Sequence, residues 1–69
     1  MRKIIGAGPF TTSEAAAILY VHPRTLLRYA REGLVASQQT IGGHRRFTRA
    51  ELERVLREGL PADRRRRQP

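Results

Sequence analysis

The chain has 69 residues, no Cys and a formal net charge of +8 at pH 7. A chain of this length forms one domain with a modest buried core, and the lack of Cys excludes disulfides and thiolate metal sites. No segment approaches the roughly 20 apolar residues that span a bilayer, and the apolar run near the start is too short for a secretory signal, so we expect a soluble cytoplasmic protein.

The first predicted helix follows a short lead. Residues 1–9 contain two Gly and one Pro and are predicted to form a flexible lead-in, so the domain is expected over residues 10–60. A capping box stands at its start, because Thr11 can cap the first free amides and Glu14 can reach back to the amide of Thr11. A helix is therefore predicted over residues 12–19.

A second helix is predicted over residues 23–32. Pro23 suits a first helical position, because its missing amide hydrogen has no partner there, and Gly33 suits a left-handed stop. His22 is expected to cap the N-terminus of this helix. The link between the two helices is only about three residues long, which is the spacing of a helix-turn-helix.

Two short strands are predicted around the adjacent glycines at positions 42–43, over residues 34–37 and 45–47. Adjacent glycines can take the positive φ of a tight turn. The predicted fold is therefore mainly α with a small β-hairpin, with three helices and a two-stranded hairpin.

The third helix is predicted over residues 49–58 and opens like the first. Thr48 and Glu51 are expected to form a second capping box, with Phe47 packed on Leu52 as a hydrophobic staple. This part of the chain carries as many acidic as basic side chains. The basic excess therefore lies in the first two thirds of the chain and in the tail.

The tail over residues 61–69 contains the consecutive run Arg64 to Arg67 and is predicted to be disordered. A flexible arm that adds nonspecific phosphate contacts and a tail that only solvates the protein both fit this run. The overall charge predicts attraction to polyanions that weakens steeply with salt. Binding to a membrane surface would need a long amphipathic helix beside the cations, and the sequence predicts none.

The second helix is basic on one face. At about 100° per residue, Arg24, Arg28 and Arg31 fall within one narrow stripe. Glu32 is the only acidic residue near them on the helix, so helical ion pairs do not account for the stripe, although a solvated basic face is the alternative. The second helix of a helix-turn-helix enters the major groove, where Arg can hold guanine or a phosphate.

The other positions of this helix divide between core and stripe. Leu26, Tyr29 and Ala30 lie opposite the arginines and are expected to pack against the first helix. Thr25 lies beside the stripe, where it can contact a phosphate or a thymine methyl group. Leu27 lies at the edge of the stripe and is either half-buried or an apolar contact to a base.

The glycine turn is followed by His44, Arg45 and Arg46. An ordinary hairpin with solvated cations is one interpretation. Beside a basic helix, we interpret the hairpin as a wing that lies along the phosphates or reaches into the neighbouring minor groove, because narrow minor grooves attract Arg.

The sequence predicts no cofactor site, no metal site and no enzymatic activity. The glycines at positions 6 and 8 lack the third glycine and the βαβ unit of a dinucleotide fold. His22 and His44 lack partners for zinc. Hydrolytic catalysis lacks an acid, because Asp63 lies in the tail and the Glu residues are assigned to caps or to the third helix.

Four stretches together resemble the DNA-binding domain of the MerR superfamily, which is a winged helix-turn-helix. They are Thr11 to Ala16, Val21 to Leu26, Arg31 to Leu34 and Gly42 to Phe47. The resemblance covers roughly residues 10–60 and is closest to the small BldC-type and excisionase-like members.

The resemblance implies roles for individual residues and for the whole chain. Its implied DNA contacts are Arg24, Thr25 and Arg28 in the major groove, Tyr29 on the backbone, and Gly43, His44, Arg45 and Arg46 in the wing. Full-length MerR regulators commonly have Arg where Leu27 stands, and they continue into a dimerisation helix and often an effector domain. Because this chain ends soon after the match, we expect no small-molecule effector and a monomer in solution.

The expected function is sequence-specific binding of double-stranded DNA by a bacterial, nucleoid-associated transcriptional regulator. The BldC-type resemblance implies head-to-tail binding on direct repeats, with neighbouring copies in contact. An excisionase-like factor that bends DNA for recombination is the close alternative. An RNA-binding module is a third possibility, although such modules expose aromatics on a sheet and the four aromatics here are assigned to core or caps.

Overall fold

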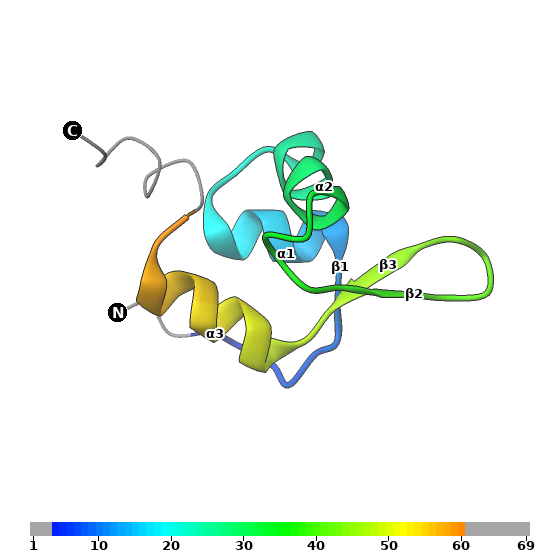
Figure 1. Ribbon diagram of the computed structural model, residues 1–69. Helices are drawn as coiled ribbons and strands as arrows, with labels where there is room; N and C mark the ends of the chain where they lie inside the picture. The colour runs from blue at the N-terminus through cyan, green and yellow to red at the C-terminus, as the bar shows by residue number, and fades with distance from the viewer. Residues whose placement is uncertain (1–3, 61–69) are drawn as a thin grey trace.

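The computed structural model describes residues 4–60, so the predicted basic tail lies outside the described residues. It contains three helices and a small antiparallel sheet, which confirms the predicted fold class (Figure 1). The elements are β1 (Phe10–Thr11), α1 (Thr12–Leu19), α2 (Pro23–Arg31), β2 (Gln38–Gln39), β3 (Arg45–Phe47) and α3 (Arg49–Glu58). None of the helices within the described part is long and apolar enough to cross a membrane.

The starts of α1 and α2 follow local signals in the sequence. Thr11 and Glu14 form the predicted capping box, because the Thr11 hydroxyl accepts the Glu14 amide at 3.1 Å and the Glu14 carboxylate accepts the Thr11 amide at 2.9 Å. His22 caps α2 as expected, since its Nδ1 accepts the amide of Arg24 at 3.1 Å. These caps fix where the two helices of the helix-turn-helix begin.

The turn between α1 and α2 has a left-handed residue that is not glycine. Tyr20 has φ 58° and ψ 43°, and its amide donates to the carbonyls of Ala16 and Ala17. After α2, Gly33 has φ 78°, which agrees with the predicted stop. The second helix ends at Arg31, one residue before the predicted end.

The sheet has the order β1–β3–β2, so β3 is its central strand. Phe10 pairs with Phe47 and Gln38 pairs with Arg46, both in antiparallel register. The strand predicted over residues 45–47 is confirmed. The sheet has one strand more than predicted, because β1 contains only two residues and is too short to stand out in the sequence.

The strand predicted over residues 34–37 is wrong, because that segment is a loop and β2 begins at Gln38. Its backbone donors are used elsewhere. The amides of Leu34 and Val35 both donate to the Tyr29 carbonyl, at 2.9 and 3.4 Å, and so complete the end of α2. The next amide of this segment, that of Ala36, donates to a side chain of the third helix.

The second predicted capping box forms only in part. The Thr48 hydroxyl accepts the Glu51 amide at 3.1 Å, as expected. The Glu51 carboxylate does not return to the cap. It accepts the Ala36 amide at 2.8 Å and binds Arg54 at 2.6 Å, so the same group joins α3 to the loop before β2.

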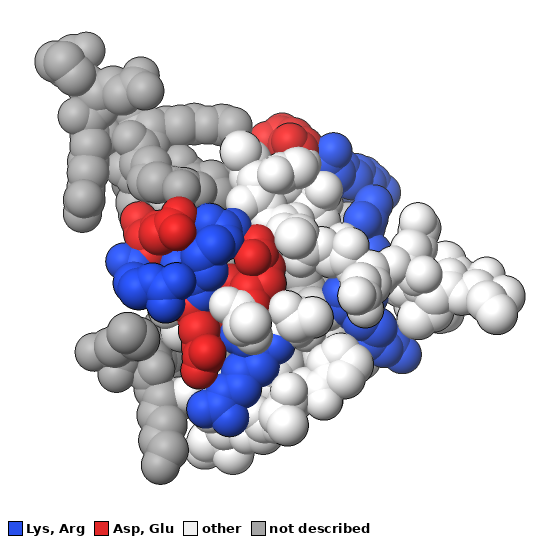
Figure 2. All heavy atoms as spheres, turned by 60° about the horizontal axis from the view of Figure 1, so that its bottom comes forward, with Lys and Arg blue, Asp and Glu red and all other residues white. Residues whose placement is uncertain are grey.

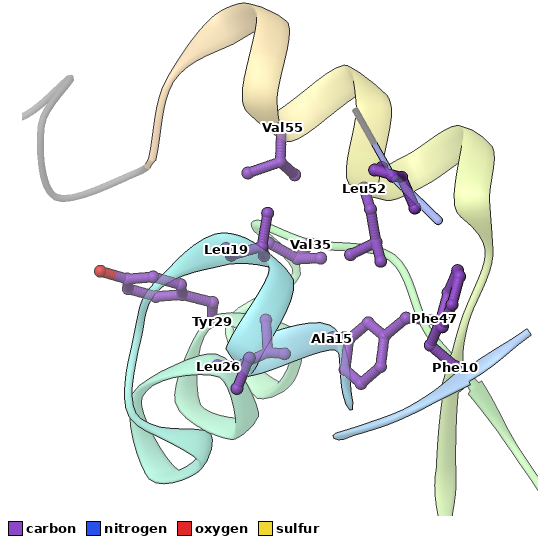
Figure 3. Close-up of a cluster of buried hydrophobic side chains, with 11 residues drawn as sticks. Phe10, Ala15, Leu19, Leu26, Tyr29, Val35, Phe47, Leu52 and Val55 are labelled. Atoms are coloured by element: carbon purple, nitrogen blue, oxygen red, sulfur yellow. The ribbon is translucent and has the colours of Figure 1, made fainter. Parts of the chain in front are cut away.

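The core lies between the helices and the sheet (Figure 3). Leu19, Val35 and Val55 face one another there, from α1, the loop and α3. Phe47 and Leu52 are both fully buried, which agrees with the predicted staple. Ile4, within the predicted lead, is only 3% exposed and belongs to the core, so the packed domain begins before Phe10.

Candidate nucleic-acid interface

The two faces of α2 differ as the sequence predicts. Leu26 and Tyr29 are 0% and 3% exposed and belong to the core, because they face α1. Arg24, Arg28 and Arg31 are all exposed. The helix therefore buries its apolar face and presents a basic stripe.

The three arginines of the stripe are not neutralised by partners within residues 4–60. No ion pair or side-chain hydrogen bond there involves Arg24, Arg28 or Arg31. The Arg28 guanidinium carbon lies 5.7 Å from the centre of the Tyr29 ring, a distance at which a cation is attracted to the ring face. A ligand with negative charge would meet three guanidinium groups without displacing an acidic side chain of residues 4–60.

The hairpin between β2 and β3 carries its charge at the base. We call Arg45 and Arg46 the stem arginines and residues 40–44 the hairpin tip. Both arginines are half-buried, and their partners are neutral: Arg45 donates to the Ser37 hydroxyl at 2.9 Å and Arg46 to the Arg45 carbonyl at 3.3 Å. The Thr40 amide donates to the His44 carbonyl at 2.8 Å, and this hydrogen bond closes the tip.

A hollow of about 410 Å³ separates α2 from the hairpin. Its lining comes from α1, α2 and the hairpin, and consists of Thr12, Leu27, Arg31, Gln39, Gly43, His44 and Arg45. A second hollow of about 340 Å³ lies beside it, lined by Thr11, Thr12, Ser13, His44, Arg45 and Arg46. The two share Thr12, His44 and Arg45 and so form one basic recess at the start of α1.

The fold brings some of the predicted site residues together and leaves others apart. Arg31 from α2 meets Gly43, His44 and Arg45 from the hairpin around one hollow, and Arg46 lines the next. The other predicted contacts on α2 do not line these hollows. Arg24 and Arg28 lie on the exposed face of the helix, and Thr25 is half-buried. Tyr29 belongs to the same helix, but its side chain is almost fully buried.

The sequence did not reveal the contribution of α1 to this surface. Thr12 and Ser13 begin α1 and face the stem arginines across the recess. The pairing of β1 with β3 places them there, because Thr11 stands opposite Arg46 in the sheet. Leu27 is half-buried and lines the larger hollow, so its side chain is available to a ligand in the recess.

The third helix has a different electrostatic character. Three ion pairs lie along it: Arg49 with Glu53 at 3.1 Å, and Arg54 with Glu51 at 2.6 Å and with Glu58 at 2.8 Å. The hydrogen bond from Arg54 lowers the pKa of Glu51, and that carboxylate in turn raises the pKa of Arg54. Figure 2 shows acidic and basic side chains interleaved over this helix, whereas the projecting hairpin is uncharged at its end and basic at its base. Within residues 4–60, uncompensated charge is therefore concentrated on α2 and the hairpin stem.

Comparison with known families agrees with this arrangement. No curated protein matches the sequence. A family model described as a helix-turn-helix domain matches residues 10–60, which include all three helices and the hairpin. Helix-turn-helix domains bind DNA with the second helix in the major groove, so DNA is the partner that the match indicates. The chain belongs to the helix-turn-helix domain family.

Proposed function

We propose that this protein is a sequence-specific DNA-binding transcriptional regulator of the MerR-like kind, acting at the nucleoid without a catalytic step or an effector. Helix α2 enters the major groove, and the hairpin contacts the backbone or the adjacent minor groove as a wing. The observation that carries the proposal is the stripe of Arg24, Arg28 and Arg31, which no acidic side chain of residues 4–60 neutralises. The stripe ends at a recess shared with the stem arginines. Both basic segments can meet one duplex, because they border the same recess.

The residue types on the stripe suit sequence reading as well as charge. Arg can hold the O6 and N7 atoms of guanine with both arms of its guanidinium group. Thr25 and Leu27 flank the stripe and offer a hydroxyl and an apolar contact for a thymine methyl group. The sheet supports duplex DNA over single-stranded RNA, because its aromatics, Phe10 and Phe47, are buried and cannot stack on bases.

The protein is proposed to bind direct repeats as head-to-tail units that are monomers when free. The described part of the chain has no long helix for a coiled-coil dimer, since α3 ends at Glu58 after ten residues. Analytical ultracentrifugation without DNA tests this directly. A stable free dimer that protects an inverted repeat would overturn the head-to-tail arrangement.

The experiment that tests the function is genome-wide mapping of bound sites, followed by a footprint on the strongest site. Regulation predicts sites at promoters, with protection on one face of the duplex. Sites confined to recombination attachment sequences would instead show an architectural factor of the excisionase kind. Competition between duplex DNA and RNA of equal length at fixed salt completes the test, and preference for RNA would reject DNA as the partner.

A further inference from the structure

The hairpin tip presents an isoleucine to solvent. Ile41 is fully exposed, and its exposed fraction is the highest among the large apolar side chains of residues 4–60. Residues 40–44 contain no Lys, Arg, Asp or Glu, so the charge of the hairpin lies behind the tip on the stem arginines. Figure 2 shows this division as an uncharged projection with basic side chains at its base.

The backbone holds this side chain away from the protein. The Gly43 amide donates to the Thr40 carbonyl at 2.9 Å, and Gly43 has φ 84°. Because Gly42 and Gly43 have no side chains, Ile41 carries the only side chain at the turn itself. The tip is therefore narrow and closed by backbone hydrogen bonds, and it carries one apolar side chain, Ile41, between the polar Thr40 and His44.

The Ile41 side chain does not suit phosphates, which are bound by cations and hydrogen-bond donors. It suits the floor of the minor groove, which is about 6 Å wide and offers sugar and base surfaces. Apolar side chains that enter this groove can wedge between base steps and bend the duplex. The stem arginines behind Ile41 would then lie at the phosphates that flank the groove.

We propose that Ile41 enters the minor groove as an apolar wedge and bends the bound DNA. This inference rests on the proposed function, because it requires that the protein bind duplex DNA with the hairpin beside α2. It adds a residue with a distinct role. Ile41 contributes apolar contact and DNA deformation, whereas Arg45 and Arg46 contribute charge. Sites with a flexible pyrimidine–purine step under the wing would be preferred, since such steps are kinked most easily.

The test compares Ile41→Ser with Ile5→Ser on a duplex that holds a single footprinted site. Ile5 is the matched control, because it is also exposed, at 87%, and lies outside the hairpin. We expect Ile41→Ser to bind about five- to tenfold more weakly, because the buried apolar area is lost, with an unchanged salt slope. Energy transfer between dyes at the two duplex ends should show the bend with wild type and with Ile5→Ser, but not with Ile41→Ser.

Further measurements keep this inference separate from the proposed function. Ile41→Leu should retain both affinity and bend, since it keeps the apolar volume. If Arg28→Ala weakens binding while Ile41→Ser changes neither affinity nor bend, the wedge is rejected and the DNA-binding function stands. If Ile41→Ser loses only cooperativity on a two-site duplex, Ile41 contacts a neighbouring copy and the wedge is also rejected. If wild type does not bind duplex DNA, the proposed function itself fails.

Discussion

The carboxylate of Glu51 accepts hydrogen bonds from Nε of Arg54 at 2.9 Å and from Nη2 at 2.6 Å, and together the two side chains hold the backbone on both sides of Val35. Glu51 accepts the Ala36 amide at 2.8 Å, and Arg54 donates to the Leu34 carbonyl at 3.3 Å. The loop between α2 and β2 is thus attached to α3. The pair fixes how the hairpin follows the basic helix.

Replacing Glu51 should destabilise the fold. Glu51→Gln keeps the size of the side chain but removes the charge that binds Arg54, and we expect a loss of roughly 1–3 kcal/mol in the free energy of unfolding. Urea denaturation measures it. Glu53→Gln is the matched control, because its ion pair with Arg49 is about half exposed and should contribute less than about 1 kcal/mol. Equal losses for the two variants would contradict the role of the Glu51–Arg54 pair.

Stability should also depend on pH through Glu51. The hydrogen bond from Arg54 holds the pKa of Glu51 below its ordinary value of 4.5 in the folded protein. The unfolded state therefore binds a proton first as the pH falls, so the stabilisation is complete above that ordinary value and is lost as the pH falls through the lower folded pKa. Denaturation curves between about pH 3 and 7 should show this acid loss, and Glu51→Gln should make it shallower. An unchanged acid limb would show that other carboxylates cause it.

Arg28→Ala tests base reading by the stripe. If Arg28 holds a base, the variant should lose roughly 1–3 kcal/mol of binding free energy at the footprinted site and much less on a scrambled duplex. Arg57→Ala is the control, since it removes the same charge from an exposed position on α3. Fluorescence anisotropy titrations on both duplexes measure the difference. Equal weakening on the two duplexes would reduce Arg28 to a phosphate contact.

The stem arginines should act on every sequence alike. The double variant with Arg45→Gln and Arg46→Gln is expected to weaken binding on specific and scrambled duplexes and to reduce the salt slope by about two, because each phosphate contact releases about one counterion. Titrations at several salt concentrations measure the slope. A slope equal to that of wild type would place the hairpin stem in solvent.

The left-handed residue in the turn predicts a preference for glycine over alanine at that position. Tyr20 has φ 58°, a conformation that costs a residue with a Cβ atom about 1–2 kcal/mol. Tyr20→Gly should be more stable than Tyr20→Ala by about 0.5–1 kcal/mol, because the relief of strain is partly offset by the greater freedom of glycine in the unfolded chain. Tyr20→Ala is the control that removes the ring and keeps the strain. Thermal melting should rank the Gly variant above the Ala variant.

The helices could be predicted from the sequence because their signals are local. The capping box of Thr11 and Glu14, Pro23 and Gly33 each act within a few residues of the chain. The loop over residues 34–37 could not be predicted, because the partner of the Ala36 amide is a carboxylate 15 residues further on. The apolar run Leu34-Val35 there reflects burial of Val35 in the core, and not a strand.

The candidate site divides in the same way. The basic stripe on α2 follows from helical periodicity alone, and all three arginines are exposed where the period places them. The recess beside the hairpin was not predictable, because Thr12 and Ser13 join it only through the pairing of two short strands. The exposed apolar side chain of the tip could not be predicted for another reason. Ile41 is inconspicuous in a sequence until its full exposure is known.

The strand pair that joins Phe10 to Phe47 connects directly to two helix caps, Thr11 for α1 and Thr48 for α3. The strand that carries the stem arginines is thus hydrogen-bonded along one edge to the start of α1 and continues into α3. A segment held in this way has lost most of its backbone freedom on folding, so binding does not have to order it again. The conformational entropy lost on association is therefore small at the hairpin stem, and more of the interaction energy of its cations remains as affinity.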